Sequence, residues 1–348
     1  MLVLYIDMDY FFAACEELRH PEFKGKPLIV GTSESRDSGK GVVMTCNYEA
    51  RKYGIHSAMP IPMAVKLKRD VNYLHEDWDY YQSISDAIMA RLREFGNPLD
   101  IMSIDEAAMG ISGMNRESAL GFAKEVKKAI QETSALPCTV AVSSGKVFAK
   151  MACDSAKPDG LKVVMPEDVK EFIGSMDIGK MPGIGPKTSE RLNAIGISEI
   201  SQLASADPMV LIDALGSFGK ELYLLANGTD NSRLVETYDI LSISREKAID
   251  PATKADEVYT LMEDLSRSVI DEIGKKGLWF RTVSVKARYD DFSERIKSKR
   301  LGNYTDSLDT LIETARRLTD ILFDGRRVRK YGVRVSSLIK SKGQKRLF

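Results

Sequence analysis

The chain has 348 residues, of which 43% are hydrophobic and 29% charged, a composition that excludes a disordered or fibrous chain. This length predicts two or three domains. The four cysteines form no Cys-x-x-Cys pair and only three histidines accompany them, so we expect neither a structural zinc site nor a disulfide framework. The apolar N-terminus is interrupted by Asp7 and Asp9, and no later apolar run is long enough to span a membrane, so we expect a cytoplasmic protein that does not bind membranes.

Charge is unevenly distributed along the chain, although 50 Lys and Arg balance 50 Asp and Glu. Residues 1–230 carry 25 basic and 32 acidic side chains, whereas residues 231–348 carry 25 basic and 18 acidic ones. The acidic part would repel a polyanion unless cations are bound to it, and the basic part would attract one.

The apolar pattern predicts alternating strands and helices in the first half of the chain. We expect strands at 2–6, 27–31, 71–75, 99–104, 107–111 and 138–143, and helices at 11–19, 47–53, 77–95 and 116–133. Without the excursion between about residues 20 and 75, the order is β-α-β-β-α-β, which is the ferredoxin-like split βαβ arrangement. Many unrelated functions share this fold, so the fold alone identifies none of them.

The second half of the chain predicts two further regions. From residue 166 onward the sequence indicates short helices separated by glycines, and residues 227–241 lack periodicity and indicate a tether. Beyond the tether we expect strands at 242–249, 282–289 and 332–339 and helices at 255–273 and 307–323, which together form a second small α+β domain.

Acidic residues end or link neighbouring strands of the predicted sheet. Asp7 and Asp9 end the first strand, and Asp105 and Glu106 occupy the turn of the hairpin. Because these strands are neighbours in a split βαβ sheet, we expect Asp7 to lie near Asp105 and Glu106, where oxygen ligands favour magnesium or manganese over zinc. Either acidic pair alone would be an ordinary strand end or turn, but together they indicate metal-dependent phosphoryl transfer.

Four motifs resemble the signatures of Y-family DNA polymerases, and the DinB-like, DNA polymerase IV branch matches best. They are Ile-Asp-Met-Asp-Tyr-Phe-Phe-Ala at 6–13, Asn-Tyr-Glu-Ala-Arg at 47–51, Ser-Ile-Asp-Glu-Ala at 103–107 and Ala-Lys-Pro-Asp-Gly at 156–160. The resemblance covers nearly all of the chain and implies an α+β fold of several domains. These are a ferredoxin-like palm (1–19 and 76–165), fingers (20–75), a helical helix-hairpin-helix thumb (166–229), a linker (230–241), an α+β little finger (242–340) and a tail (341–348).

The resemblance implies a DNA-directed DNA polymerase, a monomer that extends primer–template DNA with dNTPs by nucleotidyl transfer. Such an enzyme has low processivity and no proofreading, and it serves translesion synthesis and DNA repair as a mutator. The resemblance assigns two Mg²⁺ ions, which Mn²⁺ can replace, to the side chains of Asp7, Asp105 and Glu106 and the carbonyl of Met8. It assigns Asp9 a structural role.

A second group of residues can bind the nucleotide. Tyr48 and Arg51 lie three apart on a predicted helix and therefore share one face, and Lys157 precedes a proline. Together they can hold a triphosphate, although such a pair is ordinarily just helix surface. The resemblance supports this role and adds the backbone around Tyr10, Phe11 and Phe12. It also makes Phe12 the steric gate against a ribose 2′-hydroxyl, where the alternative is a core aromatic.

At four positions the chain differs from many members of the family. Val42 and Met44 stand where small residues often contact the nascent base pair, so we expect less room for two template bases or a large adduct. Gly110 and Gly145 replace a frequent Asp and a frequent Asn, respectively. These two changes affect the surroundings of the predicted ligands rather than the ligands themselves.

Two glycine-rich turns and a set of basic pairs are candidates for DNA contact. Gly183, Gly185 and Lys187 resemble a helix-hairpin-helix, in which backbone N–H groups approach a phosphate. Gly216, Gly219 and Lys220 form a weaker copy, and a simple helix connection is the alternative for both turns. Members of each basic pair lie two apart and so share a strand face, and we expect a sheet face lined this way to hold DNA: Arg245 and Lys247, Lys286 and Arg288, Lys297 and Lys299.

The C-terminal sequence Gln344-Lys345-Arg346-Leu347-Phe348 resembles short peptides that bind sliding clamps through Gln344, Leu347 and Phe348. Two other functions remain open. A non-catalytic DNA-binding repair factor would keep the hairpins and the basic domain, but it would not need the three acidic residues. A nucleotidyl cyclase would share the metal-binding palm, but it would leave the hairpins and the basic sheet unexplained.

Overall fold

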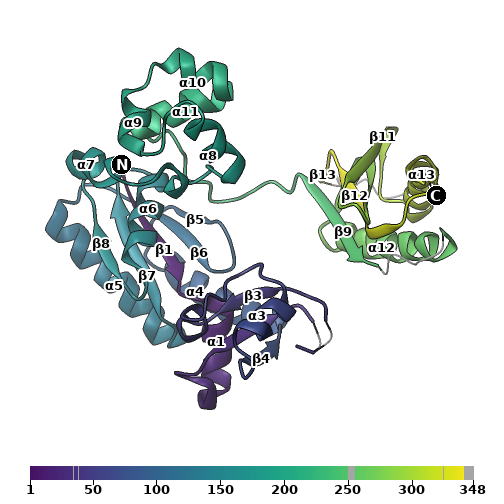
Figure 1. Ribbon diagram of the computed structural model, residues 1–348, viewed down its shortest axis with the longest axis horizontal. Helices are drawn as coiled ribbons and strands as arrows, with labels where there is room; N and C mark the ends of the chain where they lie inside the picture. Colours follow the sequence, from purple (N-terminus) through teal and green to yellow (C-terminus); the bar gives the residue numbers. More distant parts are fainter. Residues whose placement is uncertain (34, 38, 250–254, 324, 341–348) are drawn as a thin grey trace. The chain divides into compact units, whose positions relative to one another are not determined.

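The computed structural model describes residues 1–33, 35–37, 39–249, 255–323 and 325–340. It divides into two compact units, Met1–Thr237 and Tyr238–Phe348, and each is described by itself (Figure 1). Among the described residues, no helix is long and apolar enough to cross a membrane.

A five-stranded sheet forms the centre of the first unit. Its strand order is β5-β6-β1-β7-β8, and the first four of these strands confirm the predicted split βαβ arrangement. The fifth, β8, runs parallel to β7 and was not predicted, because it is a half-buried strand of three residues. The strands are β1 (Leu2–Met8), β5 (Leu99–Ile101), β6 (Glu106–Ile111), β7 (Cys138–Ser143) and β8 (Leu161–Val163).

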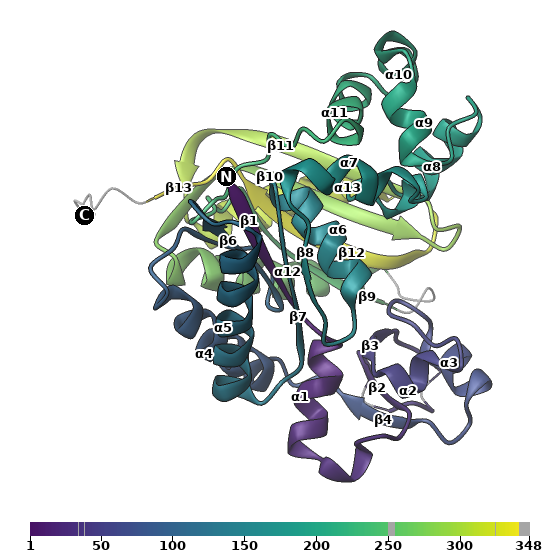
Figure 2. The same ribbon diagram turned by 90° about the vertical axis from the view of Figure 1, so that its left-hand side faces the viewer.

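Helices cover both faces of this sheet, so β1 is buried along its whole length. Leu4, Ile6 and Met8 share a core with α1 (Phe11–Arg19), α4 (Trp78–Arg93) and α5 (Arg116–Ser134). Val3 and Tyr5 face the other way, toward α6 (Lys146–Ala156), and α4 and α5 run beside each other in both ribbon views (Figure 2). A strand buried on both sides carries a continuous apolar run, as the sequence of β1 does.

The segment between about residues 20 and 75, which interrupts the palm, forms a separate small sheet. Its order is β3-β2-β4, and its strands are β2 (Leu28–Gly31), β3 (Val43–Cys46) and β4 (Asn72–His75). Asn47 joins it to the helices: its Oδ1 accepts from the Ala50 N–H as the N-cap of α2 (Tyr48–Arg51), and its Nδ2 donates to Glu17. Strand β3 was not predicted, and α2 is shorter than the predicted helix 47–53. Helix α3 (Ile61–Leu67) and the 3-10 turn η1 (Pro21–Phe23) complete this region.

Short helices follow the palm, as the glycine spacing predicted. Their apolar side chains form one core with α6, so this region packs directly on the palm. The elements are η2 (Pro166–Asp168), α7 (Val169–Gly174), η3 (Ile178–Lys180), α8 (Pro186–Asn193), α9 (Ile200–Ser205), α10 (Pro208–Leu215) and α11 (Ser217–Ala226).

The second unit is a sheet of order β11-β10-β12-β9 with two helices packed on one face. The predicted strands and helices here are all present, but β11 was missed because its polar sequence lies at the edge of the sheet and is mostly exposed. The elements are β9 (Ser242–Ala248), α12 (Ala255–Lys275), β10 (Leu278–Tyr289), β11 (Glu294–Thr305), α13 (Leu308–Leu322), β12 (Val328–Ser336) and the short β13 (Ile339–Lys340), which pairs with β10.

Candidate active site

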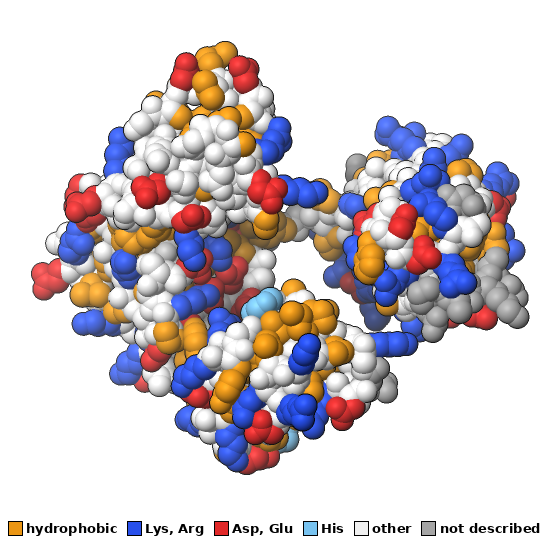
Figure 3. Space-filling view, in the orientation of Figure 1, with side chains coloured by type: hydrophobic (Ala, Val, Ile, Leu, Met, Phe, Trp, Pro, Cys, Tyr) orange, Lys and Arg blue, Asp and Glu red, His pale blue; other side chains and the backbone are white. Residues whose placement is uncertain are grey.

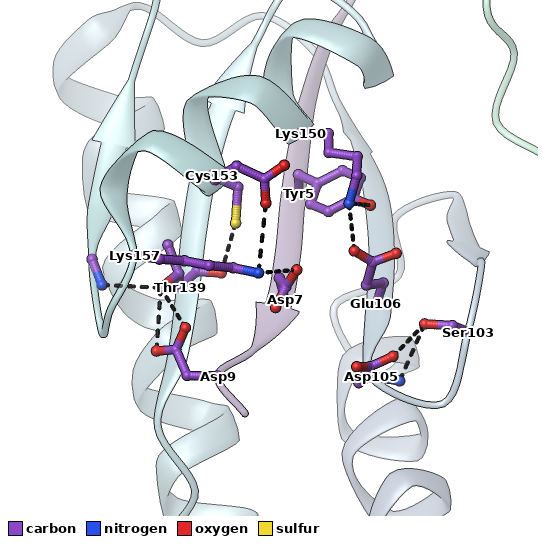
Figure 4. Close-up of polar contacts among 12 residues, drawn as sticks. Tyr5, Asp7, Asp9, Ser103, Asp105, Glu106, Thr139, Lys150, Cys153 and Lys157 are labelled. Atoms are coloured by element: carbon purple, nitrogen blue, oxygen red, sulfur yellow. Dashed lines mark hydrogen bonds and ion pairs between the residues drawn. The ribbon is translucent and has the colours of Figure 1, made fainter. Parts of the chain in front are cut away.

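The structure places the acidic residues of the first and hairpin strands side by side. Asp7 on β1 and Glu106 on β6 are direct partners in the antiparallel register, and the Met8 N–H donates to the Asp105 carbonyl at 2.9 Å. The expected approach of residue 7 to residues 105 and 106 is therefore confirmed, and Figure 4 shows the carboxylates at one edge of the palm sheet.

Two lysine ammonium groups neutralise this acidic pair. Lys157 Nζ lies 2.5 Å from Asp7 Oδ2, and Lys150 Nζ lies 2.5 Å from Glu106 Oε1 (Figure 4). Lys150 also donates to the Tyr5 hydroxyl at 3.2 Å. The two carboxylates thus already hold cationic groups, because carboxylates this close need compensating positive charge.

Asp105 is oriented differently from the other two acids. Its Oδ1 accepts from the Ser103 hydroxyl at 2.6 Å within the hairpin turn, and its side chain is only half-buried. Within the described ranges, no three His, Cys, Asp or Glu side chains are grouped closely enough to hold a metal ion.

The environment shifts the pKa values of the acidic pair in opposite directions. Burial raises the pKa of Asp7 to about 7, since Lys157 offsets only part of the lost hydration and Glu106 adds a second negative charge. Burial also acts to raise the pKa of Glu106, but the ion pair with Lys150 outweighs it, so this pKa lies below its usual value. Asp7 is thus the group that most needs a further cation in order to stay ionised.

These donors fit divalent metal ions. Asp7, Asp105 and Glu106 supply hard carboxylate oxygens, which are the ligands that Mg²⁺ and Mn²⁺ prefer. The carboxylates of Asp7 and Glu106 already hold one cationic group each, in the form of lysine ammonium groups. Asp105 accepts from Ser103 with Oδ1 alone, which leaves its second carboxylate oxygen as a further ligand.

The aromatic and basic residues predicted to bind a nucleotide come together beside the carboxylates. The rings of Tyr10 and Tyr48 meet edge to face at 5.2 Å, and the Arg51 guanidinium lies 5.0 Å from the centre of the Tyr48 ring. Burial raises the pKa of the Tyr48 hydroxyl, and the charges of Asp7 and Lys157 also act on it. Tyr10, Tyr48 and Arg51 therefore form one cluster, and Asp7 and Lys157 are near enough for their charges to act on it.

Phe12 is fixed among aromatic rings. Its ring centre lies 4.9 Å from that of Tyr81, and 5.5 Å from those of both Trp78 and Phe11. Phe11 is buried in the palm core, whereas Phe12 is only partly buried. A partly exposed ring held by three neighbouring rings keeps a fixed position at the start of α1.

The four departures from the family pattern lie in two places. Val42 is exposed and Met44 half-buried, on the opposite side of the chain from buried Val43, so both can face a ligand. A Cβ on Gly110 would lie 2.8 Å from Leu234, and a Cβ on Gly145 would lie 2.5 Å from Asp230. Both glycines therefore leave space for the first part of the predicted linker.

The two thumb turns differ from each other. Gly183 has φ of +91°, Gly185 is the N-cap of α8, and Lys187 is exposed in the first turn of that helix. Gly216 likewise precedes α11, but Gly219 is buried, and a Cβ there would lie 2.1 Å from the Leu211 carbonyl. In the second turn Gly219 thus serves the close packing of α10 and α11.

The strand register corrects the expectation that the basic pairs of the second unit line one sheet face. Lys286 pairs with Gly332, which pairs with Glu246, so Lys286 and Arg288 lie on the open face. The four other residues are in register with core residues and lie on the helix-covered face: Arg245, Lys247, Lys297 and Lys299. Two residues at spacing two lie on the same face of their own strand. Whether pairs on neighbouring strands lie on the same face of the sheet depends on the register between the strands, which the spacing does not give.

The open face forms a shallow groove. Ser244, Ser284, Ser298, Lys286 and Arg334 are among the residues that line it. Lys286 pairs with Glu294 at 3.1 Å, so part of its charge is compensated. Lys and Arg side chains nevertheless dominate the visible surface of this unit (Figure 3).

Sequence reasoning missed Lys150 and Thr139. Lys150 is a lone charged residue between apolar side chains of α6, a pattern that could have indicated a buried ion pair. Thr139 lies in a strand in which every residue is buried, and its sequence alone gives no such indication. Gln344, Leu347 and Phe348 lie outside the described residues.

Comparison with known proteins identifies the class. The impB/mucB/samB family matches residues 6–154, its C-terminal domain matches 241–347, and the HHH motif of the IMS family matches 166–197. Among solved structures, a Y-family DNA polymerase chimera of Dbh and Dpo4 superimposes with a TM-score of 0.89, at 29% identity over 98% of this chain and 100% of that one. An insertion ternary complex of Dbh DNA polymerase gives a TM-score of 0.70 at 29% identity, with the same coverage.

Curated relatives match over the whole length. A protein named DNA polymerase IV 2 from Methanosarcina mazei is 37% identical over 97% of this chain and 92% of its own. DNA polymerase IV from Clostridium perfringens is 37% identical over 97% of this chain and 94% of its own. The chain belongs to the impB/mucB/samB family of Y-family DNA polymerases, in the branch whose members are named DNA polymerase IV.

Proposed function

We propose that this protein is a template-directed DNA polymerase of the translesion type. The observation that carries the proposal is the register pairing of Asp7 with Glu106, next to Lys157 and the Tyr48–Arg51 helix, in a chain that matches DNA polymerase IV proteins over 97% of its length. The enzyme adds deoxynucleotides to a primer, with low processivity and no proofreading. A non-catalytic repair factor is not supported, because such a protein has no need of buried, paired carboxylates.

We propose that Asp7, Asp105, Glu106 and the Met8 carbonyl hold two divalent ions, with Mg²⁺ as the physiological ion and Mn²⁺ as a substitute. Such ions activate a hydroxyl and stabilise the leaving oxygen in phosphoryl transfer. These residues supply the negative charge that holds the ions, and Asp7 must be ionised to do so.

The nucleotide-binding roles follow from the cluster around Tyr48. Arg51 and Lys157 bind the triphosphate, Arg51 with its forked donors and Lys157 as a point charge that is shared with Asp7. Tyr48 and the backbone N–H groups around Tyr10, Phe11 and Phe12 position the sugar and phosphates, and the Phe12 ring excludes a 2′-hydroxyl. Val42 and Met44 lie over the nascent base pair.

Primer–template DNA binds through phosphate contacts that carry no sequence information. The support is the Gly183–Lys187 turn before α8, the turn of Gly216 and Lys220, and the basic residues of the second unit, where the open face is the better candidate. The C-terminal peptide of Gln344, Leu347 and Phe348 binds a sliding clamp. The protein acts as a monomer in the cytoplasm, which agrees with its four buried free cysteines.

Primer extension in the presence of Mg²⁺ tests the proposal. The wild type extends a primer by the templated nucleotide, and Asp105→Ala and Glu106→Ala each reduce this rate by about a thousandfold or more, because each removes a carboxylate that stabilises the transferring group. Glu132→Ala is the matched control, since it removes an exposed carboxylate on α5 that is paired with Lys128. Equal activity in all four proteins, or no extension by the wild type, would refute a polymerase.

A further inference from the structure

Asp9 is a buried acid without a part in the proposed chemistry. Its side chain is fully buried, and its carboxylate accepts from the Thr139 hydroxyl at 3.0 and 3.2 Å (Figure 4). It also accepts from the Asp159 N–H at 2.6 Å. Thr139 in turn accepts from the Gly160 N–H at 3.2 Å. A buried carboxylate is retained only when such bonds replace its hydration, so Asp9 and Thr139 together fix the backbone of residues 159 and 160.

The segment that they fix carries Lys157. This segment turns sharply after α6: Asp159 has φ of +50°, and a Cβ on Gly160 would lie 1.9 Å from the Ala156 carbonyl, so only glycine fits there. Lys127 binds the outer side of the turn through Asp159 Oδ1 at 2.8 Å. The turn is therefore held from both sides, by Asp9 in the interior and by Lys127 at the surface.

Asp7 and Asp9 both bind the turn that follows α6, one at Lys157 and the other at Asp159. Asp7 lies in β1 and Asp9 directly follows that strand. Asp7 binds the Lys157 ammonium, while Asp9 binds the backbone N–H two residues further along, at Asp159. The spacing of two in Asp-Met-Asp matches the spacing of two between Lys157 and Asp159. The ammonium is thus placed by its own ion pair and by the backbone anchor behind it.

We propose that Asp9, acting through Thr139 and the Asp159 N–H, is the positioning residue that places Lys157 for the incoming triphosphate. This inference rests on the proposed function for its kinetic consequence, because it assumes that Lys157 binds the nucleotide. The proposal gives Asp9 no contact of its own with metal or nucleotide, because its hydrogen bonds go to Thr139 and the Asp159 N–H. Loss of the anchor lets the turn move, so that Lys157 is less often in position to bind the triphosphate. The affinity for the dNTP therefore falls, whereas the rate of nucleotide transfer in the bound complex changes little.

The test uses two variants that disturb the anchor from opposite sides. Asp9→Asn offers one acceptor oxygen and turns an NH₂ group toward either the Thr139 hydroxyl or the Asp159 N–H. Thr139→Val keeps the volume of the side chain but removes the hydroxyl. Thr139→Ser keeps the hydroxyl and is the matched control.

Steady-state extension of an undamaged template should show an increase of about tenfold in KM for the dNTP in Asp9→Asn and Thr139→Val, with kcat changed by less than about threefold. Thr139→Ser, which keeps the hydroxyl, should have the wild-type KM. Asp9→Asn combined with Lys157→Ala should be no worse than Lys157→Ala alone, since the anchor acts only through that lysine. An additive double variant, or an unchanged KM in both anchor variants, would overturn the proposal.

Hydrogen exchange on the full-length protein gives a second measurement that needs no activity. In Asp9→Asn, the amides of Asp159 and Gly160 should exchange about tenfold faster, whereas those of α5 should keep the wild-type rate. Unchanged exchange at residues 159 and 160 would overturn the anchor even if the enzyme is impaired. A wild type that extends no primers would refute the proposed function instead, and the exchange result would still decide whether Asp9 fixes the turn.

Discussion

Asp7 lies in a site where its own charge is costly. It is buried beside Glu106, and burial raises its pKa to about 7 in spite of Lys157. An acid whose pKa is higher in the folded state than in the unfolded chain destabilises the fold once both states would be ionised, so stability falls as pH rises from about 4 through about 7. A bound cation would offset the free energy of ionising Asp7, so the site destabilises the fold only while no cation is bound.

Asp7→Asn should therefore stabilise the metal-free protein while abolishing primer extension. At pH 8 with a chelator, we expect the free energy of unfolding to increase by on the order of 2 kcal/mol, since a neutral side chain avoids the ionisation cost and Lys157 keeps Asp154 as a partner at 3.5 Å. Thermal melts from pH 5 to pH 8 should show that the stabilisation of Asp7→Asn relative to the wild type increases with pH. A gain that is constant across this range, or larger at pH 5, would contradict the raised pKa.

At the scale of elements, the first part of the predicted tether is bound to the palm. Asp230 accepts from the Val147 N–H at the start of α6 at 2.7 Å, and buried Asp100 accepts from the Val235 N–H at 3.1 Å while pairing with Lys146 at 2.8 Å. Gly110 and Gly145 leave the space that Leu234 and Asp230 occupy. The absence of a side chain at these two positions therefore lets the segment lie against the palm.

Gly110→Asp should release the segment 230–235, because its side chain would overlap Leu234. We expect trypsin to cut after Arg233 about tenfold faster in this variant than in the wild type, since cleavage needs a locally detached chain. Gly121→Asp is the control, because a Cβ at that α5 position meets nothing within 4 Å. Equal cleavage of Gly110→Asp and Gly121→Asp would show that the segment is held by other contacts.

Which elements could be predicted follows from their burial. β1 and β7 are buried throughout and carry apolar runs, so the palm topology and the approach of Asp7 to Glu106 followed from the sequence. β11 is exposed and polar, and no periodicity marks it. A buried partner for Lys150 could have been expected from its apolar neighbours, but its identity as Glu106 could not, because the pair joins a helix to a strand 44 positions away through side chains alone. Likewise, the face of each basic pair depends on register across three strands.

At the scale of the whole molecule, we expect the basic residues of the C-terminal part to contact DNA on the open face of the sheet. Helices α12 and α13 cover the other face, and Arg245 on that side is occupied with Glu272 at 3.4 Å. Lys286 and Arg334 line the groove of the open face. A flat, open strand surface can follow a phosphate backbone, whereas helices keep it away from the covered face.

Removing two charges from each face separates these possibilities. Lys286→Ala with Arg334→Ala should lower the slope of log Kd against log salt by about two for primer–template DNA, since each lost phosphate contact removes roughly one released counterion. Arg245→Ala with Lys247→Ala removes the same charge from the helix-covered face and should lower the slope by less than half as much. Binding measured by fluorescence anisotropy between about 50 and 200 mM salt gives both slopes. If the second pair changes the slope as much as the first, DNA is attracted by the net charge of the domain and not by its open face.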